Sequence, residues 1–154
     1  GEPDDLWLYA GELEKLMLYD SNITVSNIRH LVSPNFHDDI FAITNAFAEK
    51  RVGEAAAVLE RLSAEPVQIV GALSSQLRSL LLVKALEDKT PAEMAATLGW
   101  KEGRVWINRK LAAKFTQSRL IGMLQDLLAI DRRLKTTEEP PKLLLTLFIQ
   151  KAKA

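Results

Sequence analysis

The stretch PVQIVGALSSQLRSLLLVK, residues 66–84, decides the fold class of this 154-residue chain. Its leucine and valine side chains recur every three or four residues and therefore fall on one side of an α-helix. They are Val70, Leu73, Leu77, Leu80 and Leu81, with Lys84 at the end of the same stripe. Pro66 suits a helix start, because its fixed backbone angle matches the first turn. We expect a helix of roughly five turns at the centre of the core.

Apolar periodicity predicts further helices before this segment. Residues 4–20 form an amphipathic run that opens on two aspartates, and a short helix follows from Thr24 or Ser26. The Ser33-Pro34-Asn35 stretch ends that pair, since the residue before a proline avoids the helical region. The next helix opens at Asp38-Asp39 and points Ile40, Phe41, Ile43 and Phe47 inward. Gly53 marks a break before a helix that carries Ala56, Leu59 and Leu62.

Capping signals and periodicity predict the helices after residue 84. Thr90, Pro91 and Glu93 form a capping-box pattern, and the short helix they open stops at Gly99. A helix is expected from about Glu102 to Lys114 and another from Thr116 or Ser118, which carries Leu120, Leu124, Leu127, Leu128 and Leu134. After Pro140-Pro141, a last helix carries Leu143, Leu144, Leu147 and Phe148. No stretch alternates as a strand does, so the predicted fold class is an all-α helical bundle.

Composition excludes several classes of function. The chain has no cysteine, which excludes disulfides, thiolate metal sites and cysteine nucleophiles. It has no glycine-rich phosphate loop and no histidine pair at metal-ligand spacing. We therefore expect no catalytic residues, no cofactor and no metal. No run of about 18 apolar residues is present, so we also expect no membrane span and a cytoplasmic protein.

The charge is zero overall but unevenly distributed. Residues 1–74 carry 5 Lys and Arg against 12 Asp and Glu, a net of −7, and residues 75–154 carry 15 against 8, a net of +7. Such a division suits a protein that places acidic and basic surfaces against different neighbours. Chance clustering on solvated helix faces is an equally good explanation of the pattern.

The segment TPAEMAATLGWKEGRVWINRKL, residues 90–111, has helix-turn-helix spacing, with Ala95, Gly99 and Val105 at the positions that pack and turn. Its second helix would present a basic face for DNA or for a protein subunit, together with two tryptophans. These residues are Lys101, Arg104, Arg109, Lys110, Lys114, Trp100 and Trp106. Glu102 at the helix start and the neutral charge of the chain weaken the DNA interpretation. A solvated helix face is the simplest explanation of the basic run.

Several segments follow one another in a recognisable order, beginning with DLWLYAGELEKLMLY (residues 5–19), ITVSNIRHLV (23–32) and DIFAITNAF (39–47). The order continues through Pro66, Gln76, Arg78, Lys84, the Ala95/Gly99 pair, Phe115, Ser118, Asp131 and Leu134-Lys135. This order resembles the delta family of the bacterial DNA polymerase III clamp loader. No single motif is specific, but their order covers nearly the whole chain.

The resemblance implies a mechanical role in DNA replication within the polymerase III (nucleotidyltransferase) complex. Residues 1–34 would be the end of an AAA+-like helical lid, and residues 35–154 the collar domain that joins clamp-loader subunits. The expected partners are delta-prime and tau/gamma. The sliding clamp would be contacted only through an N-terminal domain that this chain lacks, and DNA indirectly or weakly. A helix-turn-helix DNA-binding domain at residues 90–111 is the alternative function.

Among the polar residues, Asp131 is the one whose position in the sequence is most informative about structure. It shares the stripe of Leu124, Leu127 and Leu134, and a partly buried carboxylate needs a partner because desolvating its charge is costly. We expect it to pair with Arg78, Gln76 or a basic residue on a neighbouring helix. The alternative is that it borders the stripe in water.

Overall fold

In the computed structural model, residues 35–152 are described, and all their regular structure is helical. The helices are α3 (Phe36–Ala48), α4 (Val52–Arg61), α5 (Pro66–Ala85), α6 (Pro91–Leu98), α7 (Glu102–Ala112), α8 (Gln117–Thr136) and α9 (Pro141–Lys151). The predicted all-α class is therefore confirmed for this part of the chain. The two helices predicted within residues 1–34, and with them the lid domain, lie outside the described residues.

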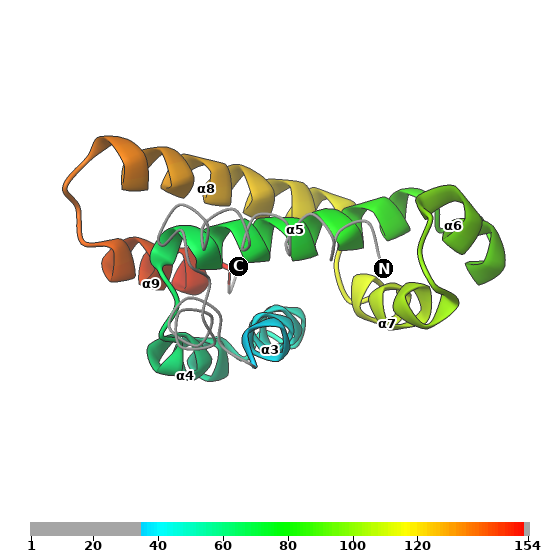
Figure 1. The fold of residues 1–154 in the computed structure, drawn as a ribbon, viewed down its shortest axis with the longest axis horizontal. Coiled ribbons are helices and arrows are strands. Elements are labelled where there is room, and N and C mark those ends of the chain that lie inside the picture. Colours follow the sequence, from blue (N-terminus) through cyan, green and yellow to red (C-terminus); the bar gives the residue numbers. More distant parts are fainter. Residues whose placement is uncertain (1–34, 153–154) are drawn as a thin grey trace, which may run out of the picture.

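Helix α5 is the centre of the arrangement, as its apolar stripe predicts. It packs against α3, α7, α8 and α9, and α8 runs antiparallel along it (Figure 1). Helices α6 and α7 lie at one end of α5, and α3, α4 and α9 lie towards the other (Figure 1). Its side chains Val70, Leu73, Leu77 and Leu80 are all at most 2% exposed.

The apolar composition of helix α5 needs a structural explanation. By length and apolar content alone it is able to cross a membrane, with a mean hydropathy of 1.2 over its apolar window. Half of that window is buried inside the protein. The contacts of α5 with four other helices account for its apolar composition.

The predicted caps are present where local sequence chemistry requires them. The Thr90 hydroxyl accepts a hydrogen bond from the Glu93 backbone, and the Glu93 carboxylate accepts one from the Thr90 backbone. The Thr116 hydroxyl caps α8 by accepting from the backbone of Arg119. Gly99 ends α6 in the left-handed conformation, with φ of 69°.

The break expected at Gly53 occurs earlier in the chain. Gly53 is the second residue of α4, and the chain reverses before it, where Lys50 adopts a φ of 58°. The backbone N–H groups of Lys50 and Arg51 donate to the last carbonyls of α3, at Phe47 and Ala46. These hydrogen bonds hold a non-glycine residue in a conformation that glycine normally takes.

Four apolar side chains of the predicted helices are exposed, and one of them, Phe41, was expected to point inward. Phe41 is 36% exposed, and Leu128, Leu143 and Leu147 are each more than half exposed. Each lies one helical position from a buried neighbour, such as Leu127 or Leu144. Apolar periodicity shows which side of a helix faces the core, but it does not show how wide the buried part of that side is. Residues at the edge of the apolar stripe therefore reach solvent.

Candidate interaction surfaces

Helix α7 carries most of the predicted basic residues, but several of their charges are engaged. Arg104 lies 3.9 Å above the Trp100 ring and donates to the Ser79 hydroxyl of α5 at 3.3 Å. Lys114 forms an ion pair with Glu49, which follows α3. Lys101 precedes the helix and is exposed, as is Lys110, while Arg109 is half-buried. The predicted basic face is therefore smaller than the sequence suggests.

The two tryptophans of this region have opposite environments. Trp100 is 6% exposed, so the prediction that it is an interface residue is wrong for the surface of this chain. The reason is local: the left-handed Gly99 turns the chain, and Trp100 folds back under Arg104 and donates its backbone N–H to Ala95. Trp106 is 57% exposed, and Arg109 lies 5.8 Å from the centre of its ring.

A buried polar contact that was not predicted from the sequence joins α7 to α5. Asn108 is 6% exposed; its amide donates to the Arg104 carbonyl at 2.9 Å, and its oxygen accepts from Gln76 of α5 at 3.3 Å. Asn108 lies three residues from Val105 and three from Leu111, both buried, and that spacing was the available signal. This contact links the buried side of α7 to α5.

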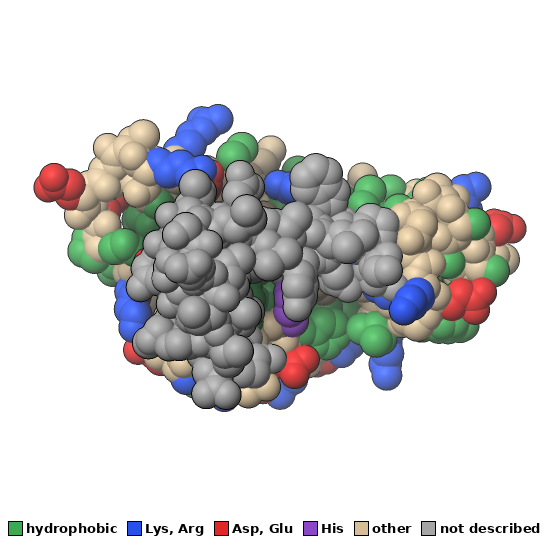
Figure 2. Space-filling model, in the orientation of Figure 1, with side chains coloured by type: hydrophobic (Ala, Val, Ile, Leu, Met, Phe, Trp, Pro, Cys, Tyr) green, Lys and Arg blue, Asp and Glu red, His purple; other side chains and the backbone are tan. Residues whose placement is uncertain are grey.

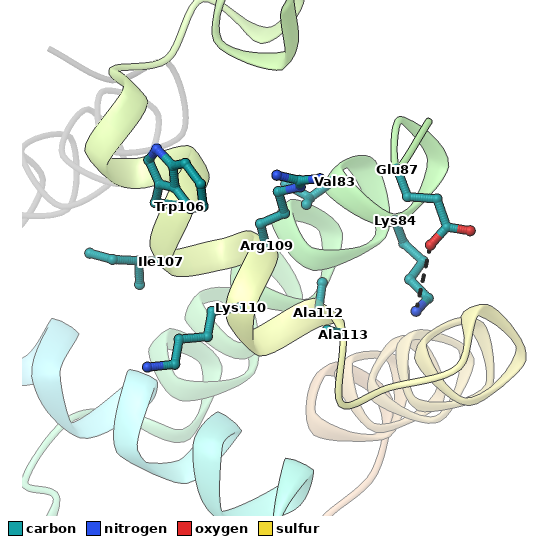
Figure 3. Close-up of a pocket in the computed structure, with 9 residues that line it drawn as sticks. All are labelled: Val83, Lys84, Glu87, Trp106, Ile107, Arg109, Lys110, Ala112 and Ala113. Carbon is teal, nitrogen blue, oxygen red and sulfur yellow. Dashed lines mark ion pairs between the residues drawn. The ribbon is translucent and has the colours of Figure 1, made fainter. Parts of the chain in front are cut away.

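A groove adjoins the outer side of α7, which we call the α7 groove (Figure 3). It has a volume of about 660 Å³ and lies between α7 and the end of α5. Its lining residues are Val83, Lys84, Glu87, Trp106, Ile107, Arg109, Lys110, Ala112 and Ala113. Lys84 and Glu87 form an ion pair at 3.8 Å, so the one carboxylate in the lining is engaged.

A second groove follows the α5–α8 contact, and it contains Asp131 and Arg78. Its volume is about 550 Å³, and Ser74, Leu81, Ile121 and Leu128 also line it. Asp131 is partly buried but pairs with Lys135 of its own helix at 2.9 Å, and no ion pair among the described residues joins it to Arg78. The predicted cross-helix partner is therefore wrong, because Lys135, one turn further along α8, satisfies the carboxylate.

Arg119 was not predicted, although it makes the longest-range polar contacts near the core. From the first turn of α8 its guanidinium donates to the carbonyls of Phe47 at 2.9 Å and Ala152 at 2.6 Å. Phe47 lies in the last turn of α3, and Ala152 directly follows α9. Burial lowers the pKa of Arg119, and its Nε has no hydrogen-bond partner.

Comparison with known proteins places this arrangement in a family. The family model for the DNA polymerase III delta subunit, C-terminal domain, matches residues 37–152. The chain belongs to this family. A relative, DNA polymerase III subunit delta of Bacillus subtilis (strain 168), is 25% identical over 146 residues, which are 90% of this chain and 42% of that protein.

The fold agrees with the delta family as well. The solved structure of the Bacillus subtilis DNA clamp loader delta protein matches with a TM-score of 0.72 at 24% identity. The match covers 93% of this chain and 44% of that one, so the chain spans less than half the length of these relatives. The predicted resemblance to the delta family and the fold class are thus confirmed.

Proposed function

We propose that this chain is the collar part of a clamp-loader delta subunit, a non-catalytic component that assembles with delta-prime and tau/gamma in the bacterial cytoplasm. The observation that carries the proposal is the delta C-terminal family match across residues 37–152, supported by the fold shared with a clamp loader delta protein. Within it, residues 35–154 would be the collar domain and residues 1–34 the end of the lid.

The α5–α8 groove is the surface that we propose for contact with a sister subunit. Its α8 wall carries an outer stripe at spacings of three and four residues, in addition to the core stripe of the same helix. The outer stripe consists of Ser118, Ile121, Gln125, Leu128, Arg132 and Lys135, all exposed. Two of these residues, Ile121 and Leu128, are apolar, and both line the groove, where a helix from another chain could bury them.

Co-elution on a sizing column tests the proposal. The chain mixed with delta-prime and tau/gamma is expected to elute as one complex, with only modest sensitivity to salt. Leu128→Glu, in the middle of the outer stripe, should remove the chain from that complex. Ala129→Glu is the matched control, because Ala129 is exposed on the same helix but does not line the groove. Equal effects of the two variants would contradict the proposed surface.

A helix-turn-helix DNA binder is the second candidate, favoured by the α6–Gly99–α7 geometry. Fluorescence anisotropy with duplex DNA across a salt series separates the two functions. A regulator of this kind should bind tightly and lose affinity steeply with salt, because each neutralised phosphate releases counterions. The collar function predicts weak binding to duplex DNA.

A further inference from the structure

The outer face of α7 exposes two consecutive large apolar side chains. Trp106 is 57% exposed and Ile107 is 55% exposed, more than any other large hydrophobic residue in the described part of the chain. Both line the α7 groove, and Figure 3 shows them projecting from the helix, with Arg109 extending towards Val83 of α5. In the region of α7, Figure 2 shows hydrophobic side chains at the surface beside Lys and Arg side chains.

The rim of the groove is positively charged. Its lining contains three cationic side chains, Lys84, Arg109 and Lys110, against the single carboxylate of Glu87, a net of +2. Glu87 is already paired with Lys84. Lys110 is exposed next to the two apolar side chains, and Arg109 lies over the Trp106 ring. A ligand for this surface therefore needs apolar side chains for the centre and negative charge for the rim.

We propose that the α7 groove binds an acidic amphipathic helix of a partner protein. Tryptophan is enriched among the residues that contribute most to binding energy at protein interfaces, and Ile107 extends the same apolar centre. A helix with leucines on one side would cover both residues and the groove, while its flanking carboxylates would face Arg109 and Lys110.

Nucleic acid fits this surface less well than a protein helix does. A nucleic-acid track needs a row of cations and aromatic faces, whereas here Ile107, Val83, Ala112 and Ala113 are aliphatic. Two further cations of α7 and its C-terminal turn, Arg104 and Lys114, are engaged with Ser79 and Glu49. The remaining rim suits a few carboxylates better than a chain of phosphates.

Binding of a defined peptide to the full chain tests this proposal. The probe is a fluorescein-labelled 15-residue helix, on the order of four turns, with leucines on one face and glutamates elsewhere. We expect saturable binding by anisotropy, and Trp106→Ala should weaken it about tenfold or more. Leu143→Ala is the matched control, because Leu143 is also about half exposed but lies on α9, outside the groove. Circular dichroism confirms that both variants are folded.

Charge changes separate the proposed ligand from other occupants. Lys110→Glu should weaken binding of the glutamate peptide and strengthen binding of a peptide in which lysines replace the glutamates. The idea is overturned if the lysine peptide binds the native chain as tightly as the glutamate peptide, or if Trp106→Ala leaves binding unchanged. It is also overturned if Trp106→Ala abolishes binding of an oligothymidine instead, or converts a dimer of the chain to a monomer. None of these measurements involves clamp-loader subunits, so they are independent of the collar assembly test.

Discussion

Replacing Arg119 with alanine should destabilise the fold more than any other single change to a surface-accessible charge. The guanidinium joins the end of the first described helix to the end of the last, through the carbonyls of Phe47 and Ala152. A hydrogen bond from a charged donor contributes about 1.5–3 kcal/mol, so the two bonds together contribute about 3–6 kcal/mol. The buried Nε without a partner offsets about 1–3 kcal/mol of this. With the midpoints of these two ranges, about 4.5 less about 2, the net loss expected for Arg119→Ala is about 2.5 kcal/mol.

Urea unfolding followed by circular dichroism measures this loss. The midpoint should fall while the slope stays constant, since the surface exposed on unfolding hardly changes. Arg119→Lys should recover part of the stability, because the ammonium keeps the charge but lies closer to the backbone than the Nη2 atom that donates to both carbonyls. Arg132→Ala is the matched control, an exposed arginine on the same helix, and should change stability by less than about 0.5 kcal/mol. If Arg119→Ala costs no more than Arg132→Ala, the bridging argument is refuted.

Three further predictions concern local interactions. Asn108→Ala should cost about 1–2 kcal/mol by thermal or urea unfolding, because Gln76 loses its partner, whereas Gln125→Ala on the exposed side of α8 should be nearly neutral. Gly99→Ala should cost about 1–2 kcal/mol, because φ is 69° there, whereas Gly122→Ala inside α8 should be neutral or stabilising, since nothing lies within 4 Å of an added Cβ. Hydrogen bonds from Arg133 hold the pKa of Glu139 below its ordinary value, so this pair stabilises the fold above the ordinary carboxyl pKa and loses its effect as pH falls through the lowered one. Carboxyl NMR titration should show that lowered pKa returning towards normal in Arg133→Gln, and an unchanged titration would contradict the assignment.

Features set by neighbours in the sequence were predictable. The caps at Thr90 and Thr116 and the turn at Gly99 depend on a few adjacent residues, and all three occur as the sequence predicts. The stripe of α5 is also local, because a periodicity of 3.6 residues fixes which side of a helix is apolar. The family resemblance drew on the same information, the order of such local features along the chain.

Contacts between distant helices were not predictable in this way. Arg119 has a positive charge in the first turn of α8, where the helix dipole disfavours it, so local rules assign it no role. Its function depends on where α3 and α9 end in space. Asp131 shows the converse: the sequence suggested a distant partner, but Lys135 is one turn away on the same helix and needs no tertiary contact.

What this pair of helices binds depends on the face of α7 that points away from the core. The helix-turn-helix spacing does not determine it. Ala95, Gly99 and Val105 constrain only the sides of α6 and α7 that face each other and α5, and any protein that packs two short helices in this way satisfies them. A DNA reader needs polar and cationic side chains on the opposite side of the second helix. That side holds Trp106 and Ile107 with only Arg109 and Lys110 beside them, and the cations nearest to α5 and α3 are engaged within the chain. Two large apolar side chains in water carry a free-energy cost that burial against a partner would remove, which supports the proposal that the outer face of α7 contacts another protein.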